Sequence, residues 1–305
     1  MGCFRYICLY TVLFLGTFTS SASFGYTGDS RDEKPVVMAM TAAFVSEGGG
    51  GVYAQIADYI TKKSGLEIEF LTGLSYGTVN AMVEDGAVDI AFISGYPYTL
   101  LHDERESSPV ELLIAPIMES PLYEGKPIYY SYVITHKDST FSKFLDLKNK
   151  RFVYNDKTSN SGYNMPRAKL IEMGETKGFF SEVLQSGSHE ESIRWVAEGK
   201  ADISAVDSLV FNYMLKTGSK YAAEIKIIDK LGPAGIPPVV KSINLSDEKA
   251  SKIKDALLHM HEDPEGQKIL KEAFVKKFIA ADDTLFDDVR RWHKMAVDAN
   301  FMEIK

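Results

Sequence analysis

The sequence VYNDKTSNSGYNM, residues 153–165, decides how the rest of the chain is interpreted. It begins with β-favouring residues, passes through a polar turn at 159–162, and continues into a helical pattern from Tyr163. A strand that enters a helix through such a turn brings backbone N–H groups, two hydroxyls and the positive end of a helix dipole together. That arrangement can bind an oxyanion such as phosphate, sulfate or carboxylate. The alternative is an ordinary helix N-cap, because Ser and Asn are favoured there in any protein.

Strand and helix patterns alternate along the rest of the chain. Further strands are expected at 34–40, 66–71, 88–93, 110–118, 128–135, 201–206 and 224–228. Alternation with short turns predicts an α/β protein with mostly parallel sheets flanked by helices. Ligands bind at the carboxyl ends of strands in such sheets, and the turns at 75–76 and 94–98 lie at those ends.

Two crossings between lobes are expected. The long, tyrosine-rich strand at 128–135 leads into a second lobe, and the irregular segment 232–238 leads back. The helical patterns at 246–261, 264–274 and 284–299 are then expected to pack on the first lobe. The predicted organisation is a first lobe of residues 34–127 plus 239–305 and a second lobe of residues 128–238, hinged by the crossing strands.

The N-terminus has the pattern of a secretory signal peptide at 1–23. Arg5 precedes an apolar run at 6–18, and small residues follow at 20–23. The alternative is an uncleaved anchor. Both cysteines, Cys3 and Cys8, lie in this leader, so a disulfide or cysteine metal site is not expected in the mature chain. Cys8 lies near the start of the apolar run and not after it, which is the wrong position for lipidation, so we expect an unlipidated periplasmic protein.

Composition limits the possible partners. The 305 residues are 45% hydrophobic and 25% charged, as in an ordinary globular protein. The formal charge of −8 makes nucleic acid or an anionic membrane surface a poor partner. An anion site would therefore be local and built from dipoles.

Several short motifs carry a family resemblance. They are SY (75–76) before EDGAVDIA (84–91), FLDLK (144–148) before ND (155–156) and SNSGY (159–163), and GSHE (187–190) before GKADI (199–203). In this order the chain resembles the phosphate/phosphite/phosphonate-binding proteins of ABC transporters, over about residues 34–263. The resemblance implies the two-lobed type II periplasmic-binding-protein fold.

The resemblance also implies a ligand site. The hydroxyls of Ser159 and Ser161 and the N–H groups of Asn160, Ser161 and Gly162 would hold the oxyanion, with His189 as the pocket histidine. The family usually has Ser-Thr-Ser-Gly, and Asn160 departs from it by replacing a hydroxyl with an amide. From its position alone, just after an N-cap, His189 is expected to be an exposed first-turn residue.

Further candidates come from the other strand ends. Tyr76 and Tyr96 could donate O–H bonds to the ligand, with Tyr96 preferred to Tyr98, although tyrosines in such turns also pack against loops. Asp207 could select a protonated oxyanion or an amino-phosphonate, because a bare carboxylate beside an anion is costly. Alternatively, Asp207 only caps the next helix. Secondary candidates on the crossing strand are Tyr129, Tyr130 and Ser131.

Catalytic and metal motifs are not found. His259 and His261 are two apart and point to different helix faces. The glycine run at 48–51 lacks the spacing of a dinucleotide loop and is interpreted as a turn. We therefore expect neither enzyme activity nor a metal or cofactor.

The resulting hypothesis is a monomeric solute-binding protein that captures a phosphonate, phosphite or phosphate between its lobes and delivers it to an ABC permease. Alternatives are an enzyme on the same fold, a receptor that feeds a sensor kinase, and a binding protein for sulfate or a carboxylate. A carboxylate site should use a bidentate arginine. The nearest arginines, Arg167 and Arg194, lie further along their helices.

Overall fold

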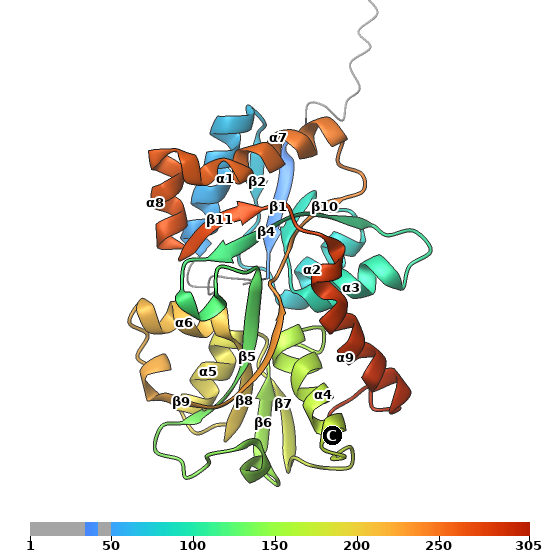
Figure 1. The fold of residues 1–305 in the computed structure, drawn as a ribbon, viewed down its shortest axis with the longest axis vertical. Helices are drawn as coiled ribbons and strands as arrows, with labels where there is room; N and C mark the ends of the chain where they lie inside the picture. Colours follow the sequence, from blue (N-terminus) through green and yellow to red (C-terminus); the bar gives the residue numbers. More distant parts are fainter. Residues whose placement is uncertain (1–33, 42–49) are drawn as a thin grey trace, which may run out of the picture. The chain divides into compact units, whose positions relative to one another are not determined.

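The computed structural model describes residues 34–41 and 50–305 (Figure 1). The predicted signal peptide and its cleavage region lie outside the described residues, as do the first two glycines of the run at 48–51. Gly50 begins the first helix, α1 (Gly50–Ser64).

The first sheet has the strand order β11-β4-β10-β3-β1-β2. Its strands are β1 (Val36–Met40), β2 (Ile68–Phe70), β3 (Ile90–Phe92), β4 (Val110–Met118), β10 (Val239–Ser242) and β11 (Val275–Ile279). β1 pairs in parallel with β2 and β3, whereas β10 and β11 pair antiparallel with their neighbours. The flanking helices include α1, α2 (Tyr76–Glu84), α3 (Gly95–Asp103), α7 (Asp247–Leu258) and α8 (Pro264–Glu272).

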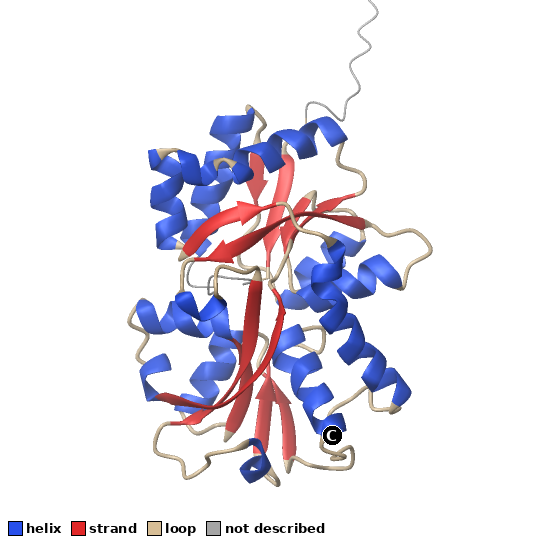
Figure 2. Ribbon diagram, in the orientation of Figure 1, coloured by secondary structure: helices blue, strands red, loops and turns tan. Residues whose placement is uncertain are grey.

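The second sheet has the order β7-β6-β8-β5-β9. Its strands are β5 (Ile128–His136), β6 (Arg151–Tyr154), β7 (Glu182–Gln185), β8 (Ile203–Asp207) and β9 (Ile225–Gly235). β6 is parallel to β7 and β8, and β5 is antiparallel to β8 and β9. Helices α4 (Met165–Glu172), α5 (His189–Ala197) and α6 (Ser208–Lys216) belong to this part of the chain (Figure 2).

These two sheets confirm the α/β architecture and correct its details. Each sheet is mixed and not mostly parallel, because β5, β9, β10 and β11 run against their neighbours. The segment expected to be irregular from 232 belongs to β9 as far as Gly235. Pro233 is tolerated there because β9 is an edge strand, where a missing N–H breaks no ladder.

Apolar side chains from both sheets fill the interior. One cluster packs Val36, Met38 and Ile90 against α1, and another packs Phe152 against Phe179 and Phe180. The rings of Phe152 and Phe180 stack with centroids 4.6 Å apart. Burying one such side chain contributes roughly 1.5–3 kcal/mol. In the part of the chain that the structure describes, no helix combines the length and the apolar character needed to cross a bilayer.

The last helix, α9 (Asp287–Asp298), contacts both α3 and α4 (Figure 1). Asn164 Nδ2 donates to the carbonyl of Val289 at 3.3 Å. Beyond α9, Phe301 and Ile304 join the buried cluster of the second sheet. The segment 284–299 was expected to pack on the first lobe; it contacts α3 there, and it also contacts α4, so it bridges the two lobes.

Candidate anion-binding site

The turn after β6 forms the centre of the site. Ser159 is the N-cap, and its Oγ accepts a hydrogen bond from the N–H of Gly162 at 3.0 Å. Residues Asn160–Asn164 form one π-helical turn that continues into α4. Ser159, Asn160 and Ser161 are each at most 1% exposed. Polar groups this deeply buried need hydrogen-bond partners from the protein or from a ligand.

Gly162 lies against an amide without a partner. A Cβ at position 162 would overlap Asn155 Oδ1, so only glycine fits. The side chain of Asn155 is fully buried, and neither of its polar atoms has a partner among the described residues. A buried amide left unpaired costs free energy, and such groups mark places where a water or ligand completes the hydrogen bonding.

His189 lies beside both serines. Its Nε2 is 3.5 Å from Ser159 Oγ and 3.4 Å from Ser161 Oγ, and its Nδ1 accepts from the N–H of Asp207 at 3.4 Å. Acceptance at Nδ1 assigns the proton to Nε2, which can donate toward the serines. Burial lowers the pKa of His189 to about 3, so the ring is neutral at physiological pH. The expectation of an exposed first-turn residue is wrong, since only 5% of His189 is exposed.

Asp207 ends β8 and caps α6. Its Oδ1 accepts from the N–H of Leu209 at 2.7 Å, as the capping alternative predicted. Burial raises the pKa of Asp207 well above its ordinary value, although the backbone bonds oppose this. The cap is compatible with a contact to a ligand, because a carboxylate has two oxygens.

The first lobe contributes Tyr76 and Ser94. The hydroxyl of Tyr76 is buried without a partner among the described residues, and Ser94 and Ser159 lie near it without forming a bond of good geometry. Burial raises the pKa of Tyr76, so it keeps its proton as a donor. Ser94 Oγ accepts from the N–H of Asn160 at 3.2 Å. Ser94 was not predicted individually, although its position at the end of β3 was the available signal.

Tyr96 points away from this cluster, contrary to the expectation. Its hydroxyl bonds to Nδ1 of His293 at 2.7 Å and accepts from Nη2 of Arg167 at 3.0 Å. The hydroxyl of Tyr98 also turns away and donates to Asp283 at 2.7 Å. The reason is that α3 packs against α9, and the partners lie on that side of the turn: His293 on α9, Arg167 on α4, and Asp283 in the short turn before α9.

Tyr129, a secondary candidate, lies in the cluster. It is fully buried, and its hydroxyl accepts from Asn160 Nδ2 at 3.0 Å. Burial raises the pKa of Tyr129 well above its ordinary value, and the charge of Asp207 adds to this. Ser131 Oγ donates to the carbonyl of Ser161 at 2.7 Å and so supports the turn.

Two of the three backbone donors expected to hold the anion are engaged by the protein. The N–H of Asn160 donates to Ser94, and the N–H of Gly162 donates to Ser159. Side-chain donors therefore dominate the cluster: the hydroxyls of Tyr76, Tyr129, Ser159 and Ser161 and the imidazole N–H of His189.

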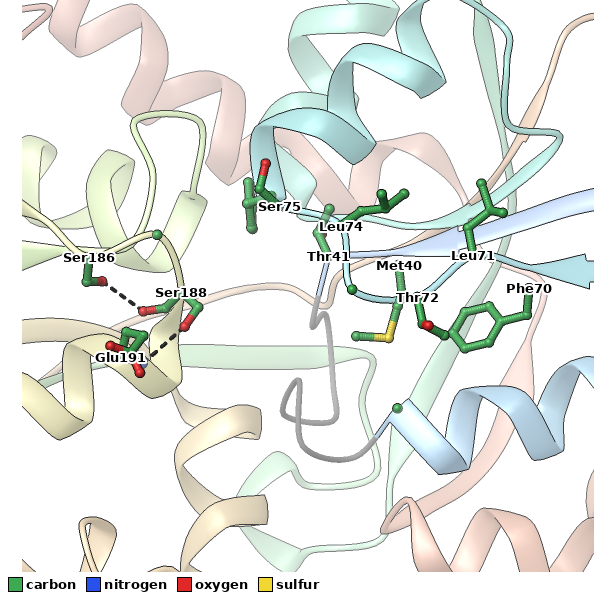
Figure 3. Close-up of a pocket in the computed structure, with 14 residues that line it drawn as sticks. Met40, Thr41, Phe70, Leu71, Thr72, Leu74, Ser75, Ser186, Ser188 and Glu191 are labelled. Carbon is green, nitrogen blue, oxygen red and sulfur yellow. Dashed lines mark hydrogen bonds between the residues drawn. The ribbon is translucent and has the colours of Figure 1, made fainter.

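A cleft of about 370 Å³ adjoins the cluster (Figure 3). One wall comes from the end of β1 and the loop 70–75, and the other from residues 186–188 and Glu191. Figure 3 shows Thr41, Leu74 and Ser75 facing Ser186, Ser188 and Glu191 across it. Tyr76 lines this cleft and Ser188 directly precedes His189, so the cleft gives access to the polar cluster.

The arrangement suits an anion held by neutral donors. Within residues 34–41 and 50–305, no three His, Cys, Asp or Glu side chains are placed to bind a metal ion. Arg167 is only 2% exposed, and its guanidinium bonds Tyr96, Asn164 and the carbonyl of Met302. It is therefore occupied and does not form a carboxylate clamp. Hydrogen bonds to an ionised acceptor are roughly twice as strong as neutral ones, so several neutral donors can hold an anion.

Comparison with known proteins gives one consistent result. The family described as "ABC transporter, phosphonate, periplasmic substrate-binding protein" matches residues 51–286. The phosphate-import protein PhnD of Mycolicibacterium smegmatis is 26% identical over 189 residues, which are 58% of this chain and 57% of that relative. The match thus spans less than two thirds of that relative's length.

Solved structures share the fold. A binding protein component of an ABC phosphonate transporter from Pseudomonas aeruginosa superposes with a TM-score of 0.74, at 21% identity over 86% of each chain. PhnD1 from Prochlorococcus marinus, in complex with methylphosphonate, gives a TM-score of 0.75 at 16% identity, over 88% of this chain and 98% of that one. This likeness confirms the predicted two-lobed binding-protein fold.

Proposed function

Because the chain belongs to the family of periplasmic substrate-binding proteins of phosphonate ABC transporters, we propose that it binds a phosphorus oxyanion at the buried polar cluster and delivers it to a membrane permease. The anion would accept hydrogen bonds from Ser159, Ser161, His189 and Tyr76. We propose a phosphonate, phosphite or phosphate as the ligand, because each presents several oxygens to such donors.

One observation carries this proposal. The hydroxyl of Tyr76 is buried without a partner among the described residues, and it lies near Ser159. His189 directs a neutral N–H at the serines over long distances of 3.4 and 3.5 Å. Buried hydrogen-bond donors that point to one place and lack good acceptors cost free energy, unless a ligand supplies the acceptors. A tetrahedral oxyanion supplies several acceptors at once.

Asp207 bears on the protonation state of the ligand. Its carboxyl group is buried beside the cluster, and burial raises its pKa well above the ordinary value. A dianion next to an ionised Asp207 would be repelled in this low-dielectric site. We therefore propose that the bound ligand and Asp207 together carry one proton. Either the ligand binds as a monoanion, or Asp207 is protonated.

The transport role completes the proposal. We propose that the leader at 1–23 is cleaved, that the chain is not lipidated, and that the protein acts in the periplasm as a monomer. Its closure on the anion would exchange water for the oriented donors of both lobes.

The test is a thermal-shift panel on the mature protein with phosphate, phosphite, methylphosphonate, 2-aminoethylphosphonate, sulfate and small carboxylates. A ligand at a hundred times its Kd adds about 2.7 kcal/mol of stability. We expect a phosphorus oxyanion to raise the melting temperature of the wild type, and Ser161→Ala and His189→Gln to reduce that shift. Ser142→Ala, at an exposed serine outside the cluster, is the control. Stabilisation by carboxylates alone would contradict the proposal.

A further inference from the structure

We propose that Asn155 is a further ligand-binding residue, whose side-chain amide nitrogen donates a hydrogen bond to an oxygen of the bound anion. This inference rests on the proposed function for the class of ligand. The unpaired state of the amide, from which it starts, does not depend on that function.

Asn155 directly follows β6 and lies between the two turns that carry the candidate donors. Its backbone carbonyl accepts from the N–H of Gly187 at 3.0 Å, and Gly187 is two residues before His189. On the side of the serine turn, its Oδ1 lies only 1.9 Å from where a Cβ of Gly162 would be. The same Cβ position is 3.1 Å from Ser159 Oγ, so the amide and this hydroxyl are close neighbours.

The orientation of the amide follows from its contact with Gly162. The hydrogen that Gly162 carries in place of a Cβ lies against Oδ1, and a Cα–H group is a weak donor to oxygen. The opposite orientation would direct an NH₂ group at this C–H group, which cannot accept, so the oxygen is assigned to this side. Nδ2 therefore faces away from Gly162, and among the described residues nothing accepts from it.

This amide is kept at a cost in stability. Asn155 is 0% exposed, so bulk water does not solvate its amide. Asn164, at the end of the serine turn, is equally buried, but both of its amide atoms are paired, with Arg167, Asn160 and Val289. The fold can thus pair a buried amide in this region. A polar group that stays unpaired beside a candidate site is explained if the ligand supplies its partner.

An oxygen of the anion is the acceptor that Nδ2 lacks. The NH₂ group adds a neutral donor to the hydroxyls and to the imidazole of His189. It cannot accept a hydrogen bond, so it favours a ligand oxygen that carries no proton. It also does not titrate, so its contribution to the affinity does not change with pH, unlike those of His189 and Asp207.

The deciding variant is Asn155→Leu, which has nearly the same shape but no polar side-chain atom. We expect it to weaken the binding of methylphosphonate, phosphite or phosphate about ten- to hundredfold in calorimetry, because a hydrogen bond to a charged acceptor is lost. Without ligand, the variant should melt at the wild-type temperature or above it, because an unpaired buried amide has been removed. Affinity within about twofold of the wild type would overturn the proposal. If leucine prevents folding, Asn155→Ala removes the amide without added bulk and should show the same loss of affinity.

Asn212→Leu is the matched control. The amide nitrogen of Asn212 donates to the hydroxyls of Tyr123 and Tyr132 at 3.0 and 3.4 Å, so this amide is paired. Leucine at 212 should therefore lower the melting temperature and leave the affinity within about twofold. The opposite responses of the two variants separate a ligand donor from a structural amide.

A direct measurement uses the wild type with ¹⁵N-labelled asparagine, saturated with methylphosphonate. The side-chain amide protons of Asn155 should show scalar coupling to the ³¹P nucleus across the hydrogen bond, which a structural role does not produce. Absence of this coupling would overturn the proposal. If no phosphorus probe binds the wild type, the proposed function fails instead. The melting temperature of Asn155→Leu then still tests the unpaired amide, and a lowered value would refute it.

Discussion

The chain contains the tripeptide Ser-Gly-Tyr at two strand-to-helix turns, Ser94–Tyr96 after β3 and Ser161–Tyr163 at the start of α4, and their environments differ. A Cβ at Gly95 would meet the ring of Phe286 at 3.2 Å, whereas one at Gly162 would overlap the unpartnered amide of Asn155. The first turn is thus packed by an apolar ring and the second by a polar group. The same local sequence supports structure in one place and a candidate binding site in the other.

The two tyrosines of these turns behave alike. The guanidinium of Arg167 lies 5.6 Å from the ring centroids of both Tyr96 and Tyr163. The hydroxyl of Tyr96 bonds to His293, and that of Tyr163 accepts from the N–H of Ile304. In both turns, therefore, the tyrosine points to Arg167 and the C-terminal segment. The serine and the tyrosine of this motif thus point in different directions in both turns.

The largest effect on the free energy of unfolding is expected from replacing the glycine of a Ser-Gly-Tyr turn by alanine. Gly162→Ala forces a buried side chain out of place and should cost about 3 kcal/mol or more in unfolding free energy. Gly95→Ala needs only a small shift of a ring and should cost about 1 kcal/mol. Urea unfolding measures both, with Gly51→Ala, where a Cβ meets nothing within 4 Å, as the control. Equal costs at the two glycines would remove the contrast between the turns.

The second turn also differs from the first in its neighbour, because Ser161 faces His189. The free energy of unfolding should therefore depend on pH through this histidine. Burial holds the pKa of His189 at about 3 in the folded protein, against 6.5 in the unfolded chain. Between these values the unfolded state binds more protons, so the stability contributed by this group falls as pH falls, by about 1.4 kcal/mol per unit. Asp207 has a raised pKa and acts in the opposite direction where the two ranges overlap.

The measurement is urea unfolding of the wild type, His189→Gln and Asp207→Asn between pH 4.5 and 6.5. Relative to His189→Gln, the wild type should lose about 2.3 kcal/mol over this range, because the full slope is reached only below the unfolded pKa of 6.5. Relative to Asp207→Asn, it should gain stability as the pH is lowered. A pH-independent difference between the wild type and His189→Gln would show that the imidazole is not held neutral.

A smaller effect should distinguish Tyr96 from Tyr76. Tyr96→Phe removes the bonds to Arg167 and His293 and should cost about 2 kcal/mol of stability without changing the affinity for the anion. Tyr76→Phe removes a hydroxyl with no described partner, so it should cost affinity and leave the stability of the ligand-free protein nearly unchanged. Calorimetric binding and urea unfolding on both variants provide the check. The reverse pattern would return Tyr96 to the binding site.

The smallest effect concerns Ser94. Ser94 is the N-cap of α3 without a cap bond of its own, and its Oγ instead accepts from Asn160 across the two lobes. Ser94→Ala should cost about 1 kcal/mol and weaken anion binding severalfold. Ser246→Ala, which removes the cap bond of α7 outside the cleft, should cost a similar amount of stability but no affinity. If both variants lose affinity equally, the cross-lobe bond has no special role.

Local signals explain what could be predicted from the sequence. Strand β4 has the predicted bounds, and the turn between β6 and α4 lies where its Ser/Asn/Ser/Gly residues indicated. These features depend on residues adjacent in the chain. Strand β10 was missed because it is short and contains Lys241, which is buried in the structure and pairs with Glu111. Its partners β3 and β4 are more than a hundred residues away in the chain.

Side-chain direction at the site could not be predicted for a similar reason. The orientation of Tyr96 is set by α9, and the burial of His189 by the turn 159–161, and both contacts join distant segments. The residue types of the serine turn were enough to predict it from the sequence. That the polar side-chain atoms of Asn155 and the hydroxyl of Tyr76 lack partners among the described residues can be known only from the structure.

The bridging position of the C-terminal segment also has a consequence for biosynthesis. Strand β10 lies between β3 and β4, so the first sheet remains in two pieces until residue 242 has been translated. The core of the second sheet includes Phe301 and Ile304, which are made last. Both sheets therefore depend on late parts of the chain for their final packing, and we expect folding to finish only after these segments have been made.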